Sequence, residues 1–275
     1  MTTNRLRTPA PTRTLRFGDT TVAFVPDGVV QLPGRGWLPD TTDEVWAAHP
    51  EYLDETGHLT ASIGALLVTR DDRTLLIDAG VGKVSMQAQP GSKIGAIEGG
   101  ALLDNLAALG HQPTDIEAVA LTHLHMDHTG WLTAFTEARY LITEPEWTNR
   151  AHGTDANHAT LDAIAPRVHQ VSDEEEIFPG VHVLMSPGHT AGHATYVITA
   201  GDQRILAFGD AMHSPIQVAN PDWVAASDHD RAQAVESRRR LVNELTTPNT
   251  IGFGIHFADV QFGQVTNGAW QPLPH

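Results

Sequence analysis

LTHLHMDHTG, residues Leu121–Gly130, is the stretch of sequence that decides the fold. It places His123, His125, Asp127 and His128 within six residues, directly after an apolar run that is typical of a β-strand. In an extended segment alternate side chains share one face, so the first two histidines point the same way where the strand ends. Neutral imidazole and carboxylate groups are zinc ligands, and four of them that converge at a strand end can serve two ions.

Four further stretches also place a histidine or an aspartate at the end of an apolar, strand-like run. They are LLIDAG at Leu75–Gly80, SPGHTAGH at Ser186–His193, FGDAMH at Phe208–His213 and GFGIHF at Gly252–Phe257. The predicted strands alternate with helical patterns, which is typical of a layered α/β protein. The sequence therefore predicts an α/β fold whose strand ends collect metal-ligand side chains.

HxHxDH followed by Thr-Gly, with these four stretches in order, resembles the metallo-β-lactamase-fold hydrolases, a superfamily of mostly dizinc enzymes. The resemblance extends from about residue 60 to residue 260. It implies a four-layer αββα sandwich, in which two mixed β-sheets are flanked by helices. Residues 1–275 would then form a single domain, with a loose N-terminal tail at about 1–12 and an insert or lid at about 27–60.

The resemblance also assigns seven side chains to two zinc ions per chain, with other divalent metals as alternatives. The residues carried over for the first ion are His123, His125 and His189, those for the second are Asp127, His128 and His256, and the bridging residue is Asp210. His213 and His229 are alternatives to His256, which is preferred because the apolar run IGFGI leads into it, as in the family pattern. By the same resemblance, His193 would pack behind the ligands, and His213 would line the pocket.

In this family the two ions share a bridging hydroxide, which would attack a carbonyl carbon and so open a lactone or cleave an ester. Asp127 would also carry the proton to the leaving group. SPGHTAGH, GDAMH and the long N-terminal insert look most like the acyl-homoserine lactonase and methyl-parathion-hydrolase-like branch. The sequence thus predicts an acyl-homoserine-lactonase-like hydrolase that takes a small-molecule substrate.

Several alternatives stay open at this stage. The ligand set is shared by phosphotriester hydrolases and by the thioesterase glyoxalase II, although no basic cluster suited to glutathione is evident. An iron-dependent redox enzyme on the same fold is a different class, but the diiron reductases usually carry Glu where His125 stands. A protein that holds the ions only for structure is a third. One common class of true β-lactamase needs a cysteine ligand, and this chain has none.

The amino-acid composition limits the kinds of partner and of chemistry that the protein can use. Lys and Arg total 17 against 33 Asp and Glu, a formal charge of −16, which disfavours nucleic-acid binding because that binding depends on cations that neutralise phosphates. The absence of cysteine excludes disulfides and thiol nucleophiles. No signal-peptide pattern or membrane-spanning stretch is evident, so we expect a cytoplasmic protein without a membrane partner. The family resemblance also implies a homodimer.

Three local predictions concern the surroundings of the site. Asp78 either holds the ligand loops in place or only forms a turn. Pro26-Asp27-Gly28 reads as a turn that ends a strand, and Gly82–Gly100 reads as an irregular loop. In the insert, four apolar side chains either wall a substrate pocket or pack on the core; they are Trp37, Leu38, Trp46 and Tyr52.

Overall fold

The computed structural model describes residues 2–151 and 157–274 and contains two mixed β-sheets. The strands of the first sheet are β1 (Arg13–Phe17), β2 (Thr20–Pro33), β3 (His58–Arg70), β4 (Arg73–Ile77), β5 (Val84–Met86), β6 (Ile97–Gly99), β7 (Ala118–Ala120), β8 (Arg139–Thr143) and β9 (Val168–Val171). Those of the second are β10 (Glu176–Phe178), β11 (Val181–Met185), β12 (Ala194–Ala200), β13 (Gln203–Ala207), β14 (Thr250–Phe253), β15 (Phe262–Thr266) and β16 (Ala269–Pro272).

The α-helices are α1 (Thr2–Arg5), α2 (Gly34–Trp37), α3 (Asp43–Ala48), α4 (Leu102–Ala108), α5 (Met126–Thr129), α6 (Glu144–Asn149), α7 (His158–Ile164), α8 (Ile216–Ala219) and α9 (Arg231–Leu245). The 3₁₀ turns are η1 (Pro50–Tyr52), η2 (Pro113–Asp115), η3 (Leu132–Ala134), η4 (Ala165–Arg167), η5 (Gly209–Ala211) and η6 (Ala258–Val260).

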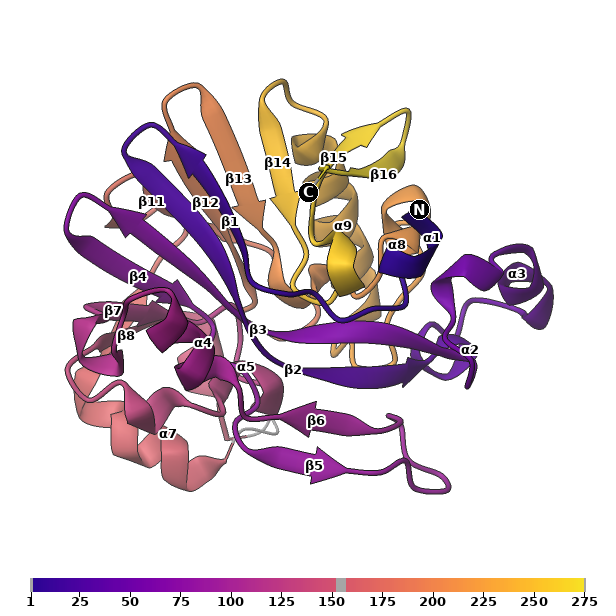
Figure 1. The fold of residues 1–275 in the computed structure, drawn as a ribbon, viewed down its shortest axis with the longest axis horizontal. Coiled ribbons are helices and arrows are strands. Elements are labelled where there is room, and N and C mark those ends of the chain that lie inside the picture. The colour runs from indigo at the N-terminus through magenta and orange to yellow at the C-terminus, as the bar shows by residue number, and fades with distance from the viewer. Residues whose placement is uncertain (1, 152–156, 275) are drawn as a thin grey trace.

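The strand order of the first sheet is β5-β6-β2-β3-β4-β7-β8-β9, with β1 added beside β2, and the second sheet runs from β10 to β16 in sequence order. Both sheets are mixed, because β4, β7, β8 and β9 pair in parallel in the first and β13 pairs in parallel with β14 in the second. The sheets lie face to face with helices on their outer sides (Figure 1). The predicted αββα sandwich with two mixed sheets is confirmed.

Alternating side chains in the strands build three apolar layers. In β3, Leu66 and Val68 pack between the sheets, where they join Val183 and Tyr196 of the second sheet. Leu67, which points the other way, packs among side chains of the helices that cover the first sheet, notably α4 and α7. The helix α9 covers the second sheet through its buried leucines. The period of two along each strand therefore supplies one face to the shared core and one to the helices.

The strand β2 continues through the predicted turn at Pro26-Asp27-Gly28, so that prediction is wrong. Pairing with β3 runs from Thr20 to Pro33, and a register shift between Pro26 and Gly28 marks a β-bulge. The bulge turns the buried Asp27 carboxylate towards two loops, where it accepts hydrogen bonds from the backbone N–H groups of Val81 and Leu102 at 2.7 and 2.9 Å. The irregular region of the insert therefore begins at residue 34, after β2.

Two other segments are more ordered than predicted. Gly82–Gly100 contains the paired strands β5 and β6, and β6 also pairs with β2. The described part of the N-terminal tail packs against the body of the protein, since Ala10 is buried and its N–H donates to Ser62 Oγ at 2.9 Å. The expectation of a loose tail therefore does not hold for this part.

Candidate metal centre

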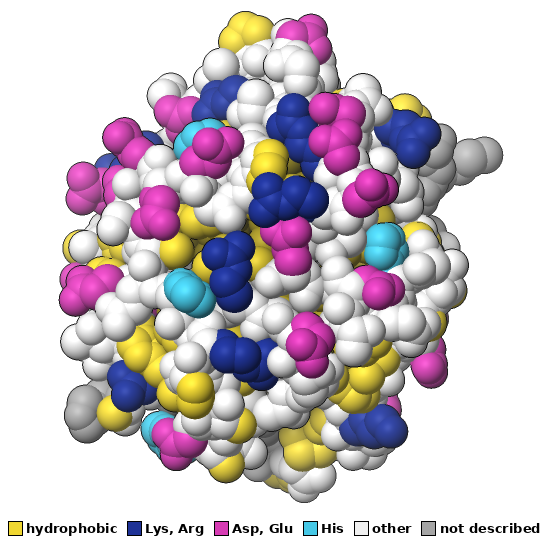
Figure 2. All heavy atoms as spheres, turned by 90° about the vertical axis from the view of Figure 1, so that its left-hand side faces the viewer, with side chains coloured by type: hydrophobic (Ala, Val, Ile, Leu, Met, Phe, Trp, Pro, Cys, Tyr) yellow, Lys and Arg dark blue, Asp and Glu magenta, His cyan; other side chains and the backbone are white. Residues whose placement is uncertain are grey.

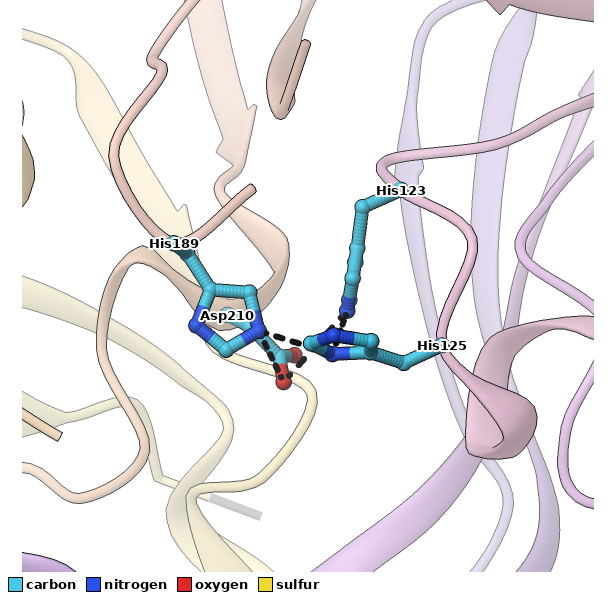
Figure 3. Close-up of side chains that lie close together, drawn as sticks. All are labelled: His123, His125, His189 and Asp210. Atoms are coloured by element: carbon cyan, nitrogen blue, oxygen red, sulfur yellow. Dashed lines mark hydrogen bonds and ion pairs between the residues drawn. The ribbon is translucent and has the colours of Figure 1, made fainter. Parts of the chain in front are cut away.

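The structure brings all seven predicted ligand residues together where strands of the two sheets end. Their donor atoms form two groups, each with its atoms within 4.8 Å of one another; the groups are His123, His125, His189 and Asp210, and Asp127, His128 and His256. The loop after β7 and the short helix α5 carry the residues of the HxHxDH motif. The loops after β11, β13 and β14 carry His189, Asp210 and His256 from the other sheet. Figure 3 shows the first group, with side chains from the two sides pointing at one another.

In the first group, unprotonated nitrogens converge on one point. Asp228 Oδ1 lies 3.1 Å from His189 Nδ1, and Thr122 Oγ1, which donates to Asp78, lies 3.0 Å from His123 Nδ1. These acceptors place the proton on Nδ1 and leave the Nε2 lone pairs free. Both Nε2 atoms lie beside His125 Nδ1, at 2.9 and 3.0 Å, although one N–H can satisfy only one of them. A cation fits this convergence of lone pairs.

The second group shows the same arrangement. His128 Nδ1 lies 2.8 Å from Asp78 Oδ2, and His256 Nδ1 donates to the carbonyl oxygen of Ser62 at 2.8 Å. Their Nε2 atoms lie 3.1 and 3.0 Å from Asp210 Oδ1. His128 Nε2 and Asp210 Oδ1 are buried, and although they are in contact, neither makes a hydrogen bond of good geometry among the described residues. Because buried polar atoms are nearly always paired, these atoms also fit a bound cation.

The pKa shifts of His128 and Asp210 also indicate that the site favours positive charge. Burial lowers the pKa of His128, but the charges of Asp210, Asp78 and Asp127 outweigh it and raise this pKa well above its usual value. Burial raises the pKa of Asp210, but the surrounding histidines hold it well below the ordinary value. Without a cation, protons must therefore neutralise the buried carboxylates. Imidazole and carboxylate donors suit divalent zinc, so the residues present fit the metal that the fold implies.

Asp78 takes the first of its two predicted roles, because its side chain holds a ligand loop in place. It has a left-handed backbone with φ of 64°, and its buried carboxylate accepts the N–H of Thr122 at 2.8 Å beside His128. This carboxylate is the kind of outer partner that fixes the tautomer of a metal-bound histidine.

Sequence reasoning missed Glu146, which joins the two ligand loops. Its carboxylate is 4% exposed and accepts the N–H groups of Leu124 and Gly192, both at 2.9 Å. Thr190 donates a third hydrogen bond to it at 2.7 Å. Leu124 lies between two ligands of the first group, and Thr190 follows a third. The only signal in the sequence was an acidic residue soon after the strand β8.

Asp228 is a second residue that sequence reasoning missed. Besides orienting His189, its carboxylate forms a buried ion pair with Arg238 at 3.1 Å. The guanidinium of Arg238 also donates to backbone carbonyls, among them that of Ala211 at 2.7 Å. Asp228 thus connects a ligand of the first group to the helix α9.

His193 packs behind the ligands, as predicted. Its Nε2 accepts the backbone N–H of Asp210 at 3.1 Å, so its proton lies on Nδ1 beside Ser186. Of the residues weighed against His256, His213 is buried against Asp210, with its Nε2 3.2 Å from Oδ2, and His229 is exposed. His256 lies in the second group, where the sequence predicted it.

Burial lowers the pKa of His193 to about 3, which predicts a pH-dependent contribution to stability. The unfolded chain, with a histidine pKa of about 6.5, binds the proton more readily, so this contribution is present above pH 6.5 and is lost as pH falls towards 3. In metal-free protein, the difference in unfolding free energy between wild type and His193→Gln should shrink by about 2 kcal/mol from pH 7 to pH 5. Urea titrations would measure it; a difference that stays constant with pH would contradict the prediction.

A cavity of about 370 Å³ opens onto the two groups. Apolar side chains from β2, β6 and the insert line it, with Asp127, Asp210, His213 and His256 at the metal side. Of the four insert residues weighed above, Trp37 lines the cavity, whereas Leu38 and Trp46 are buried in an apolar cluster against which Tyr52 packs. The insert therefore contributes both a pocket wall and core packing.

A family model described as the metallo-beta-lactamase superfamily matches residues 63–246 of the chain. The chain belongs to this superfamily. Curated relatives include an N-acyl homoserine lactonase from Bacillus sp, 26% identical over 165 residues, which are 59% of this chain and 64% of that protein. The N-acyl homoserine lactonase AiiA of Bacillus thuringiensis subsp. kurstaki is 26% identical over 158 residues, 56% of this chain and 61% of its own. The chain thus matches about three fifths of the length of these metallo-β-lactamase relatives.

Solved structures share the metallo-β-lactamase fold over nearly the whole chain. One is AidC, a dizinc quorum-quenching lactonase in complex with a product, with a TM-score of 0.81 and 21% identity, covering 97% of this chain and 98% of that one. Another is the hydrolase AbOPH, with a TM-score of 0.75 and 24% identity, covering 97% and 98%. The full α/β sandwich, including the segments outside the matched family model, is therefore common to these proteins.

Two surface properties bear on the predicted partners. On the face shown in Figure 2, basic and acidic side chains are interspersed, and the basic ones do not form one continuous area. Among the described helices, none combines the length and the apolar composition that a membrane crossing requires.

Proposed function

We propose that this protein is a dizinc hydrolase that opens lactones or cleaves esters. The observation that carries the proposal is the convergence of histidine lone pairs on the Asp210 carboxylate. Four of these histidines are oriented by a contact at Nδ1; they are His123, His128, His189 and His256. His123, His125 and His189 would hold one ion, Asp127, His128 and His256 the other, and Asp210 both. Bound zinc would supply Lewis acidity and lower the pKa of a coordinated water to about 7.

Asp127 is the residue we assign to proton transfer. It lies in the first turn of α5 and lines the cavity, with Oδ2 3.5 Å from His256 Nε2 and Oδ1 3.8 Å from His128 Nε2. Its side chain is 20% exposed, unlike the buried Asp210. A carboxylate that reaches both the ligand group and the cavity can take a proton from water and give it to the leaving oxygen.

Asp127→Asn should separate the metal-binding role of this residue from its role in proton transfer. The amide oxygen can still coordinate a metal, but it cannot accept the proton, so kcat should fall by about 10²–10⁴ while bound metal stays near two ions per chain. Steady-state kinetics and elemental analysis would measure both. Asp104→Asn, in the first turn of α4, is a matched control because that residue is exposed. An unchanged kcat in Asp127→Asn would show that another group moves the proton.

The lactone or ester class is supported by the relatives and by the cavity. The matched curated proteins include N-acyl homoserine lactonases. The cavity walls are apolar near Val30, Leu32 and Ile97, which suits an acyl chain next to a reacting carbonyl. Zinc rather than iron is proposed on the family resemblance and on the similarity to the dizinc lactonase AidC. Cytoplasmic location, a homodimer and a single domain stay predictions from the sequence.

The test is an assay of purified protein for metal content and for hydrolysis of acyl-homoserine lactones, p-nitrophenyl esters, a phosphotriester and a glutathione thioester. We expect about two zinc ions per chain and the highest kcat/KM with a lactone or an ester. Preference for the phosphotriester or the thioester would replace the proposed substrate class. Absence of turnover with full metal occupancy would indicate that the ions are structural.

A further inference from the structure

Buried polar atoms without a partner are concentrated at the cavity. Such atoms occur on six side chains of residues 2–151 and 157–274, and five of these side chains lie at the site; they are Trp37, His128, Asp210, His213 and Ser227. Bound metal explains the atoms of His128 and Asp210. His213 Nε2 lies 3.2 Å from Asp210 Oδ2, beside the candidate metal centre, and both of its ring nitrogens lack a hydrogen-bond partner among the described residues. The Trp37 indole N–H and the Ser227 hydroxyl are buried groups that bound metal does not explain.

These two groups belong to one wall of the cavity. The backbone N–H of Ala226, which precedes Ser227, donates to the carbonyl oxygen of Trp37 at 2.8 Å, so the two segments are joined. The Trp37 ring also packs edge-on against His213, with centroids 5.2 Å apart at 72°. His213 in turn stacks on His256, with centroids 5.6 Å apart and planes 5° from parallel. The wall is therefore fixed relative to the candidate metal centre.

We propose that Trp37 Nε1 and Ser227 Oγ bind a second acceptor oxygen of the substrate, next to the carbonyl that is hydrolysed. An indole N–H can only donate, and a hydroxyl can donate, so an acceptor oxygen of the substrate would satisfy both groups. A buried donor without a partner is costly, and an entering acceptor removes that cost. Because both atoms are shielded from solvent, a small rotation of the lining side chains must accompany binding.

The inference rests on the proposed function and narrows it to lactones that carry an acyl-amide or a similar carbonyl on the ring. A lactone with a plain alkyl chain would bind the same apolar wall and leave both donors unpaired. Sites built to hydrogen-bond a substrate group discriminate strongly against analogues that lack the group. The enzyme should therefore prefer the amide-bearing substrate.

The experiment compares N-hexanoyl-homoserine lactone with a γ-butyrolactone that carries a heptyl chain in place of the hexanoyl amide. In Trp37→Phe and in Ser227→Ala, kcat/KM for the amide substrate should fall about tenfold more than kcat/KM for the alkyl lactone, which contacts the same wall but lacks the acceptor. Trp46→Phe is the matched control, because the Trp46 indole donates to Thr41 Oγ1 at 2.9 Å inside the insert. Its ratio of the two kcat/KM values should equal that of wild type. An equal fall for both substrates in Trp37→Phe and Ser227→Ala, or no fall, would overturn the inference.

A binding measurement keeps the inference separate from the proposed function. If wild type hydrolyses neither these lactones nor p-nitrophenyl esters, the proposed function fails, and calorimetry with N-hexanoyl-homoserine and zinc-loaded protein decides the inference alone. Binding that weakens about tenfold in Trp37→Phe and in Ser227→Ala supports it, and circular dichroism checks that the variants are folded. Binding that is unchanged in folded variants, or absent in wild type, overturns it.

Discussion

Asp210→Ala should abolish hydrolysis. The Asp210 side chain is 5% exposed, and its Oδ1 lies 3.0 Å from His256 Nε2 and 3.1 Å from His128 Nε2. Its Oδ2 lies 3.4 Å from His189 Nε2, so one side chain faces both ligand groups. Without it, the two ions lose their shared anion. If several kcal/mol of transition-state stabilisation depend on the pair of ions, kcat/KM falls on the order of 10³-fold or more.

Activity and metal content of Asp210→Ala would be measured together. We expect less than two ions per chain in the variant, since both ions would lose a ligand and its negative charge. Asp222→Ala is a suitable control, because that aspartate is exposed and pairs only with Arg239 among the residues described, at 2.7 Å. An Asp210→Ala variant with two ions and wild-type kcat/KM would refute the assignment of the bridging residue.

Removal of metal should destabilise the fold strongly. In metal-free protein the Nε2 atoms of His123 and His189 lie 2.9 and 3.0 Å from His125 Nδ1, which can donate a proton to only one of them. The buried charge of Asp210 is then balanced only by protons on the surrounding histidines. A ligand present at 1,000 times its Kd stabilises the folded state by about 4 kcal/mol. At about 2–4 °C per kcal/mol for a large domain, chelation should lower the Tm by about 8–16 °C.

Thermal unfolding followed by circular dichroism, with and without a chelator, would measure this shift. Addition of zinc should restore the original Tm, and Asp210→Ala should respond less to the chelator than wild type. Equal Tm values for loaded and chelated wild type would mean that these histidines bind no metal tightly.

The metal groups were predictable because their signal is local. His123, His125, Asp127 and His128 lie in one short motif after a strand, and the distant ligands each follow an apolar run of their own. Since strands of a sandwich end at a common edge, the position of each ligand along its strand was enough to predict that they meet. The hydrogen bonds that orient these residues could not be predicted from the sequence and are seen only in the structure.

The outer partners were not predictable for the opposite reason. Glu146 bonds to Thr190 across 44 residues and His189 to Asp228 across 39, so no spacing in the sequence marks either contact. The turn expected at Pro26-Asp27-Gly28 failed because pairing with β3 overrides local turn propensity, and a bulge absorbs the extra residue.

Each ligand group takes donors from both sheets, with His123, His125, Asp127 and His128 on the first and His189, Asp210 and His256 on the second. Neither sheet alone can assemble a complete coordination shell. During folding, each half would therefore stay without tightly held metal until the two halves dock. Uptake of the ions should consequently be among the last kinetic events after synthesis, and its rate should report on the docking of the halves rather than on their individual formation.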